Sequence, residues 1–375
     1  MKLPVLFPVV IAAVGFFGLV SPVQAGGGIG SPRLEIVAQM KERPGNIAVA
    51  ADGRMFVSVH PFDSPMYRVL LVSPDGTSKP YPDAKWSAEP AGDGVGLAAV
   101  IHLKVMGDTL YILDMGNQRV QPKLVAWDTA KNKLDHVWYL PNHVNTAQSF
   151  HQDFVITPDR KNVFIADMGQ VDIAAKADPA IVHLSLETGM ARRLLANHPS
   201  LRPSAKPMVA AGQEMRLSRE GKESTLYLGL NPIAMDPAGE WIYYAPMGQG
   251  LMYKVRVKDM IDPVLSADDL SAKLVVVGTK PPSDGILVDG LENIFIASVA
   301  DGAIGVMNNK GKYSTWLRDP LLSWPDGLAF GPDNAIYLTV NQLHLAAMFN
   351  KGEDMSEPPY IIARIVGGRP LEKKK

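Results

Sequence analysis

One phrase recurs six times along this chain, and it constrains the fold more than any other feature of the sequence. Each copy combines a polar or glycine-rich corner, a short apolar run, a turn and a second strand-like run. The copies occupy residues 44–60, 101–116, 151–169, 230–248, 283–302 and 325–344. A repeat of this size indicates that one supersecondary unit is built several times over and that the units pack against one another.

Each copy contains two strand-like runs separated by turn signals such as Asp52-Gly53, Pro158-Asp159 and Pro332-Asp333. Further strand candidates follow most copies, at residues 67–72, 123–127, 180–185, 251–257 and 302–307. Three or four strands in each of six copies describe an all-β chain, and specifically a six-bladed β-propeller. No low-complexity linker divides the chain, so we expect a single propeller domain over residues 26–370.

The last copy lacks an outer strand of its own before the C-terminus, apart from residues 360–366. The segment RLEIVAQ at residues 33–39 precedes the first copy, and we expect it to complete the last blade and close the ring, because an open blade leaves unpaired strand edges. Residues 196–224 are an expected insertion, a loop or helix on one face, that directs Met208, Met215 and Leu217 inward. Residues 259–274 are a second helical candidate.

The N-terminus has the pattern of a secretory signal. Lys2 precedes an apolar run at residues 5–20, and small residues lead up to Ala25, so we expect cleavage after Ala25. A membrane anchor is the alternative, but the run is short for a spanning helix and Pro8 interrupts it. The sequence thus predicts a signal peptide at residues 1–25, a secreted or periplasmic mature protein, and no integral membrane segment after the signal is removed.

The charge balance excludes one large class of partners. The 37 Lys and Arg residues nearly cancel the 38 Asp and Glu residues, and no basic stripe is present that would follow a phosphate backbone. Nucleic acid is therefore not an expected partner. The chain has no cysteine, which removes disulfides, thiolate nucleophiles and thiolate metal sites. Oligomeric state is left open by these features.

Every copy places one polar side chain near the start of its first strand. If the copies are blades of a ring, these six side chains converge near the axis, where a pocket for a small molecule is expected. The predicted axial residues are Asn46, His102, Asp153, Asn231, Asp284 and Asp326.

The axial set is rich in oxygen donors, which suit Ca²⁺ better than zinc or copper. The predicted metal ligands are Asp153, Asn231 and Asp284, the predicted cofactor is a divalent cation with Ca²⁺ preferred, and no organic cofactor is expected. His102 favours a softer metal or a hydrogen-bonding role instead. Two alternatives stay open, because an Asp before Gly is often a turn residue bonded to its own backbone, and axial polar groups often hold channel water.

Several short motifs carry a family resemblance. They are PGNIAV at 44–49, KLVAWD at 123–128, KPPSDG at 280–285, RDP at 318–320, WPD at 324–326 and TVNQLH at 339–344. With them the chain resembles the major royal jelly protein/yellow family, in the form often described in bacteria as dopachrome-tautomerase-related. The resemblance implies a propeller that binds a small, possibly aromatic molecule on its axis, with tautomerase activity in some members.

Two further residues belong to the predicted site, Asn341 through the resemblance and Trp324 through its place in the sequence. In yellow-type ligand binders a Ser/Thr-x-Asn pattern in the final blade lies at the mouth of the pocket, and residues 339–341 match it, which implicates Asn341. The alternative is that Asn341 only ends a strand and turns the chain. Trp324, next to Asp326, is an expected wall of the pocket. The chain departs from the family where Asn231-Pro232 replaces a common Asp-Gly, and in lacking the disulfides of many insect members.

Whether the protein is an enzyme is left open by the sequence. The spacing of the histidines gives no catalytic dyad, and no nucleophile elbow, zinc-protease motif or P-loop is present. One hypothesis is a small-molecule binder with tautomerase activity. A second is a metal-dependent lactonase of the gluconolactonase/SMP-30 type, for which Glu42 gives a partial match to a glutamate typical of those enzymes. A third is a non-enzymatic interaction scaffold that uses its loops.

Overall fold

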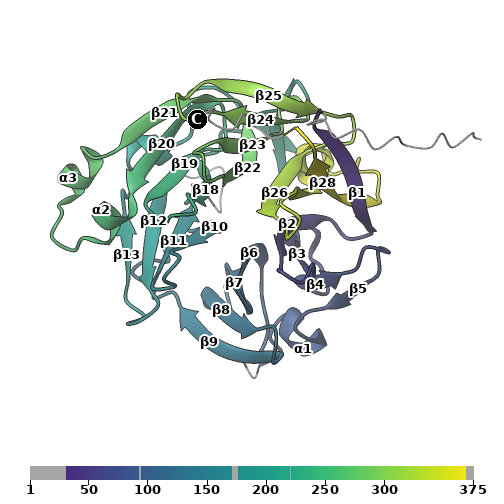
Figure 1. Ribbon diagram of the computed structural model, residues 1–375, viewed down its shortest axis with the longest axis horizontal. Coiled ribbons are helices and arrows are strands. Elements are labelled where there is room, and N and C mark those ends of the chain that lie inside the picture. Colours follow the sequence, from purple (N-terminus) through teal and green to yellow (C-terminus); the bar gives the residue numbers. More distant parts are fainter. Residues whose placement is uncertain (1–30, 93, 171–175, 220, 369–375) are drawn as a thin grey trace, which may run out of the picture.

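The computed structural model describes residues 31–92, 94–170, 176–219 and 221–368. These residues form six four-stranded antiparallel sheets arranged as blades around a central axis (Figure 1). The prediction of a six-bladed β-propeller is confirmed.

The first three blades are consecutive along the chain. They consist of β2 (Pro44–Val49), β3 (Met55–Val59), β4 (Val69–Val72) and β5 (Ser78–Pro80); β6 (Val100–Met106), β7 (Thr109–Asp114), β8 (Lys123–Asp128) and β9 (Lys133–Tyr139); and β10 (His151–Ile156), β11 (Asn162–Asp167), β12 (Ala180–Ser185) and β13 (Ala191–Leu194).

The other three blades follow after an insertion. They consist of β18 (Leu230–Met235), β19 (Trp241–Pro246), β20 (Gly250–Arg256) and β21 (Val275–Lys280); β22 (Ser283–Val288), β23 (Ile294–Ser298), β24 (Ala303–Met307) and β25 (Tyr313–Arg318); and β26 (Pro325–Phe330), β27 (Ile336–Val340) and β28 (Tyr360–Val366) with β1 (Arg33–Met40).

The hydrophobic core lies between the blades. The second strand of a blade is covered on both faces by neighbouring blades, so β3 (MFVSV) and β23 (IFIAS) are buried at every position. β-branched and aromatic residues fill such two-sided strands well. The outermost strands are more exposed, as in β9 and β13.

The ring is closed by the N-terminal strand. β1 pairs antiparallel with β28, from Arg33 opposite Val366 to Met40 opposite Tyr360, with a register break at Val37. The predicted closing segment, residues 33–39, is thus confirmed and is one residue longer than expected. The pairing covers the outer edge of β28 and joins the two ends of the described chain.

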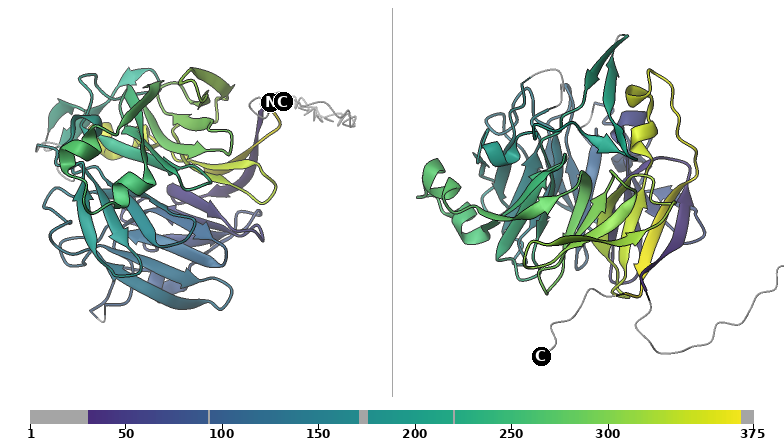
Figure 2. Two further views of the ribbon diagram at one scale, coloured as in Figure 1. Left: turned by 60° about the vertical axis from the view of Figure 1, so that its left-hand side comes forward. Right: turned by 90° about the horizontal axis from the view of Figure 1, so that it is seen from above.

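The insertion after the third blade consists of hairpins and not of a helix. It contains a 3₁₀ turn η2 (Pro199–Leu201) and the strands β14 (Val209–Ala210), β15 (Gln213–Glu214), β16 (Arg216–Arg219) and β17 (Lys222–Thr225), paired β14 with β15 and β16 with β17. These hairpins lie on the face opposite the chain ends (Figure 2). Met208 and Met215 are buried as expected, whereas Leu217 is half-buried.

The remaining helices are short. They are α1 (Ala84–Ser87), α2 (Val257–Ile261), α3 (Ala267–Ser271), η1 (Pro61–Asp63), η3 (Leu343–Leu345) and η4 (Ala347–Phe349). The helix expected at 259–274 is split in two, because Pro263 cannot continue α2, and Ser266 caps α3 by accepting a hydrogen bond from the Asp269 amide. No helix in the described ranges could cross a membrane. The predicted signal peptide lies outside the described residues.

The innermost strand of every blade has a register break near its start. The breaks fall between residues 44 and 47, 100 and 103, 151 and 153, 230 and 233, 283 and 286, and 325 and 328. A bulge of this kind releases a residue from the strand ladder and re-aims its side chain. Each of the six predicted axial residues lies in, or directly after, one of these breaks.

Candidate functional site

Contacts between neighbouring blades join four of the six predicted axial residues in two pairs. His102 of the second blade contacts Asp153 of the third, whose carboxylate reaches the backbone of the fourth. Asn231 of the fourth blade contacts Asp284 of the fifth. Four of the six, Asn46, Asp153, Asp284 and Asp326, are only 5–7% exposed. The alternative that these Asp residues only bond to their own turns does not describe Asp284 or Asp326, because both carboxyl groups accept hydrogen bonds from other side chains.

Two glycines explain why the inner strands meet so closely here. A Cβ at Gly285 would lie 2.3 Å from the Asp326 carbonyl oxygen, and a Cβ at Gly327 would lie 2.7 Å from the Asn46 Cα. The Asp-Gly pairs of the fifth and sixth blades therefore serve packing between neighbouring blades.

His102 and Asp153 form a hydrogen-bonded pair. His102 Nδ1 lies 2.5 Å from Asp153 Oδ1, and the imidazole ring packs edge-on against Phe154 with ring centroids 4.9 Å apart. The Asp153 carboxylate also accepts hydrogen bonds from the Phe154 and Ile233 amides, at 2.6 and 3.3 Å. Because the carboxylate holds the proton on Nδ1, Nε2 is left as the basic nitrogen. Spacing along the chain did not indicate this dyad, since its members lie on neighbouring blades.

Asp284 is held by two side-chain donors. Asn231 Nδ2 donates to Oδ1 at 2.6 Å and Trp324 Nε1 donates to Oδ2 at 2.8 Å. Trp324 is 2% exposed, has a left-handed φ of 62°, and stacks on His344 with an interplanar angle of 10°. A bulky residue in this backbone region is strained, and such strain is concentrated at functional sites. Trp324 therefore holds the Asp284 carboxyl group in position through its indole N–H.

Asn341 lies behind Asp326 and not at the mouth of a pocket. It is fully buried, donates from Nδ2 to Asp326 Oδ2 at 2.8 Å, and accepts at Oδ1 from the Leu343 amide at 3.0 Å. Its carbonyl oxygen accepts from the buried guanidinium of Arg43 at 2.6 Å. Asn341 therefore follows the end of β27, as one interpretation of the sequence expected. It also belongs to the site, as the other expected, but it orients Asp326 and does not lie at the entrance.

Asn46 contributes an unsatisfied acceptor. Its Oδ1 is buried and has no hydrogen-bond partner among the described residues. A buried amide oxygen without a donor is costly, which points to a water or a ligand group that supplies one.

Two of the axial carboxyl groups, Asp284 and Asp326, resist ionisation. Burial, reinforced by the negative charge of Asp153, raises the pKa of Asp284 from 3.8 to about 6, although the bonds from Trp324 and Asn231 oppose the rise. Burial and the charges of Asp284 and Asp153 raise the pKa of Asp326 well above its ordinary value. Asp326 has one side-chain donor against two for Asp284, so it is the better candidate for a protonated carboxyl group at neutral pH.

The predicted metal ligands are engaged in hydrogen bonds within the protein. Within the described ranges no three His, Asp or Glu side chains are placed so that they could share a metal ion. Of the predicted ligands, Asn231 turns its amide N–H toward Asp284, and the oxygens of Asp153 and Asp284 already accept N–H bonds. Glu42, the partial lactonase match, is exposed and lines a groove on the rim.

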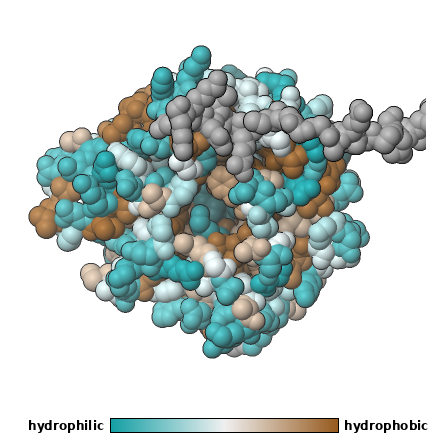
Figure 3. Space-filling view, viewed as in Figure 1, coloured by the Kyte–Doolittle hydropathy of each residue, from teal (hydrophilic) through white to brown (hydrophobic). Residues whose placement is uncertain are grey.

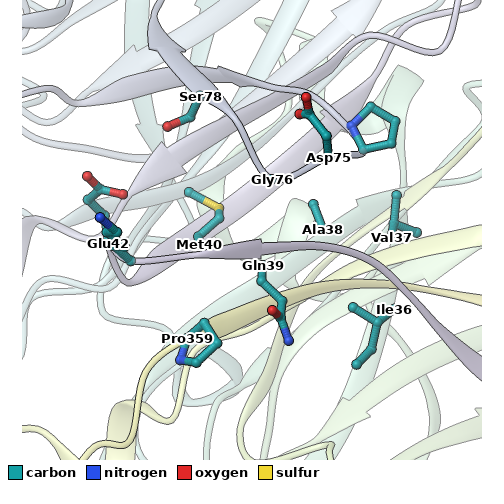
Figure 4. A pocket seen from close by; sticks show the side chains of 12 residues that line it. Ile36, Val37, Ala38, Gln39, Met40, Glu42, Asp75, Gly76, Ser78 and Pro359 are labelled. Atoms are coloured by element: carbon teal, nitrogen blue, oxygen red, sulfur yellow. The ribbon is translucent and has the colours of Figure 1, made fainter.

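Figure 3 shows a hollow with a hydrophilic floor near the centre of the face drawn in Figure 1. The opposite end of the axis is roofed by a buried apolar cluster that includes Met168, Met208, Met215 and Met247 together with Trp324. A groove of about 750 Å³ lies elsewhere, where β1 meets the first blade, and Ile36, Gln39, Asp75 and Pro359 line it (Figure 4). Because no axial residue lines this groove, the hollow is the more relevant entrance.

Two lysines near the axis were missed by sequence reasoning. Lys280 is 1% exposed and donates to the carbonyl oxygens of Met247, Gly248 and Pro281 at 3.0–3.2 Å; burial lowers its pKa to about 7, against the charge of Asp284. Lys104 lies on β6, two residues after His102. For Lys104 the available signal was a lysine on an innermost strand, where apolar residues are expected, whereas Lys280 ends the outermost strand β21 and gave no such signal.

The comparisons with known proteins place this chain in one sequence family. A family model described as "Major royal jelly protein" matches residues 108–349, and the resemblance inferred from the motifs is confirmed. None of the curated proteins matches the chain in sequence.

Solved structures share the fold at low sequence identity. A gluconolactonase from Xanthomonas campestris superposes with a TM-score of 0.55 at 13% identity, covering 90% of each chain. A luciferin-regenerating enzyme gives 0.54 at 12%, covering 90% of this chain and 96% of its own. A PQQ-bound aldose sugar dehydrogenase from Streptomyces coelicolor gives 0.52 at 11%, covering 90% and 99%. Since these proteins are named for different activities, the likeness establishes the propeller alone.

Proposed function

Because this chain belongs to the major royal jelly protein family, we propose that its axial site binds a small molecule and transfers a proton within it, as a tautomerase of dopachrome-like compounds does. The observation that carries the proposal is the pairing of a base with an acid at one axis. His102 is oriented by Asp153, and Asp326 is a carboxyl group whose pKa is raised well above its ordinary value. General acid–base catalysis usually needs one group that accepts a proton and a second group, in the same site, that keeps a proton to donate.

The proposed step conserves protons. His102 Nε2 removes a proton from a carbon next to a carbonyl or imine group, and the carboxyl group of Asp326 delivers one to the other end of the conjugated system. Product release restores both groups after the proton returns from His102 to Asp326 through solvent or the ligand. Asp284, with both oxygens bonded to N–H groups, and Asn46, with its free oxygen, orient the molecule.

The test combines binding and turnover. Wild-type protein is assayed with dopachrome as the substrate, beside His102→Asn and Asp326→Asn. Loss of general acid–base help costs about 10²–10⁴ in rate, so both variants should lose turnover while remaining folded. Asp289→Asn, in the hairpin turn of the same blade as Asp284, is the matched control and should be unchanged. Equal turnover in all four proteins would refute the proposal.

A metal-dependent lactonase is the alternative, favoured by one observation. The negative charges of Asp153, Asp284 and Asp326 repel one another at the axis, and a bound cation would neutralise them. In that case a panel of sugar lactones should be hydrolysed with added Ca²⁺ and not with a chelator. Chelator-insensitive binding of the dopachrome-like compound supports the acid–base proposal. An interaction scaffold would show neither activity, and the axial variants would leave it unaffected.

We also propose that the protein works outside the cytoplasm, on the basis of the N-terminal sequence pattern. Intact-mass analysis of protein from the extracytoplasmic fraction should give a chain that begins at residue 26. A mature chain that retains Met1 would support the membrane-anchor alternative.

A further inference from the structure

Arg43 is a buried arginine in the short link between the ring-closing strand β1 and the first blade. Its side chain is fully buried, whereas its neighbours Lys41 and Glu42 are exposed. An arginine is rarely buried unless its N–H groups are satisfied, because removing a guanidinium from water is costly. The burial of Arg43 therefore indicates that bonds inside the molecule offset this cost.

The nitrogen atoms of the Arg43 guanidinium reach three separate segments. Nε donates to Asp63 Oδ2 of η1 at 2.9 Å, and Nη2 donates to Ser356 Oγ at 3.3 Å and to Asp354 Oδ1 at 3.5 Å. Nη1 donates to the backbone carbonyl oxygen of Asn341 at 2.6 Å, which is the shortest of these bonds. The planar fork of an arginine can serve all of these acceptors at once, and the compact ammonium of a lysine cannot.

Asn341 lies where the chain leaves the sheet of the sixth blade. β27 ends one residue earlier, and Gln342 turns the chain with a left-handed φ of 54°. At this turn the backbone N–H of Asn341 donates to the Trp324 carbonyl oxygen at 3.2 Å, and its side chain donates to Asp326 Oδ2 at 2.8 Å. Asn341 thus connects Arg43 to two residues of the axial site.

A role in fastening surface loops does not account for the burial of Arg43. The side chains of Asp63 and Asp354 are 37% and 51% exposed, so water already solvates both carboxylates and an ion pair with either adds little. Asn341 is fully buried, and a hydrogen bond from a charged donor is stronger than one between neutral groups. The bond to Asn341 is therefore the one that favours a buried guanidinium at this position.

We propose that Arg43 is a positioning residue of the axial site. By holding the Asn341 carbonyl group, it fixes the direction in which the Asn341 side-chain amide meets the Asp326 carboxyl group. Because Arg43 lies between β1 and β2, closure of the ring also sets the geometry at the axis. The inference rests on the proposed function only in treating Asp326 as part of the site.

The experiment measures hydrogen exchange of side-chain amides in full-length protein labelled with ¹⁵N-asparagine. The signals of Asn341 and Asn231 are assigned by their absence from Asn341→Ser and Asn231→Ser. In the wild type both NH₂ groups should be protected from exchange, because each donates to a buried carboxyl group. Arg43→Met removes every donor, so exchange at Asn341 should become at least about tenfold faster, as expected for the loss of one hydrogen bond. Exchange at Asn231 should change by less than about twofold.

Two further variants make the result decisive. Arg43→Lys keeps the positive charge but lacks the fork, so it should also speed exchange at Asn341, and it carries the test if Arg43→Met does not fold. Arg68→Met is the matched control. Arg68 is 9% exposed and donates to three backbone carbonyl oxygens at 2.8–3.0 Å, those of Pro65, Met66 and Ala98. Its replacement should leave both asparagine amides protected.

Unchanged exchange at Asn341 in both Arg43 variants would overturn the inference. Equal acceleration at Asn341 and Asn231 would also overturn it, because a loss of global stability alone exposes both amides together.

Turnover of dopachrome keeps this inference separate from the proposed function. If the wild type is active, Arg43→Lys should lower kcat at least about tenfold with little change in KM, because a misplacement of about 1 Å can cost about 10²-fold in rate. Selective loss of protection at Asn341 in a protein without turnover removes only the tautomerase. Turnover in the wild type, with Asn341 still protected in both variants, removes only the positioning role.

Discussion

Replacement of Asp284 by Asn should shift the difference in stability from the wild type in favour of the variant as the pH rises. The native pKa of Asp284 is about 6, against 3.8 for the unfolded chain, so the folded state holds its proton more tightly. A raised native pKa means that stability is present at low pH and is lost as the pH rises from about 3.8 to about 6. At about 1.4 kcal/mol per pKa unit, ionisation of this one buried group costs the wild type roughly 3 kcal/mol above pH 6.

The measurement is the free energy of unfolding by urea, followed by tryptophan fluorescence, for wild type and Asp284→Asn. Asn carries a single oxygen, so one of the donors Asn231 and Trp324 loses its acceptor, at a cost of about 1–3 kcal/mol that does not depend on pH. The informative quantity is therefore the change in the difference between the two proteins. From about pH 4 to about pH 7.5 it should move by roughly 2 kcal/mol in favour of the variant.

Asp52→Asn supplies a control of opposite sign. Backbone and side-chain hydrogen bonds from Arg54 lower the pKa of Asp52, so its carboxylate stabilises the fold at neutral pH. The free energy of unfolding of Asp52→Asn should therefore fall relative to the wild type as the pH rises. A pH-independent difference between wild type and Asp284→Asn would refute the reasoning, because it would mean that Asp284 titrates alike in the folded and unfolded states.

Three further predictions concern the site and the ring. Trp324→Phe removes the Nε1 donor and should raise the pKa of Asp284 further, which ¹³C NMR titration of the carboxyl groups can measure. Gly327→Ala should destabilise the fold by about 1–3 kcal/mol, since its Cβ would meet Asn46, whereas Gly290→Ala, with open space around it, should be close to neutral in the same urea assay. Deletion of residues 26–40 removes β1 and should lower the thermal midpoint in calorimetry; an unchanged midpoint would show that ring closure contributes little.

Much of the architecture could be predicted from the sequence because the repeat is local. Each blade is built from short runs and turns that are adjacent in the chain, so the six copies and the closing strand at residues 33–39 could be recognised from pattern alone. The strand expected at 180–185 coincides with β12, and that at 360–366 coincides with β28. The insertion at 196–224 was the exception, because its hairpins lack a repeat that would indicate their structure.

The axial positions were also predictable, since one polar residue stands at the same place in each copy. Their chemistry was not. That His102 pairs with Asp153 and that Asn231 donates to Asp284 depend on side chains from different blades. That Asn341 orients Asp326 from a buried position depends on two strands of the sixth blade. Residues 102 and 153 are distant in sequence, and only the curvature of the ring brings them within hydrogen-bonding distance.

The sequence by itself thus determined the fold, its closure and the residues that face the axis, because these follow from local patterning repeated six times. The tertiary structure decided which of those residues are charged, bonded or free. Burial raises the proton affinity of Asp284 and Asp326, and both residues lie in bulges of their strands. Proton affinity depends on the distances between charges and on the exclusion of water, and neither quantity is encoded at any single position of the chain.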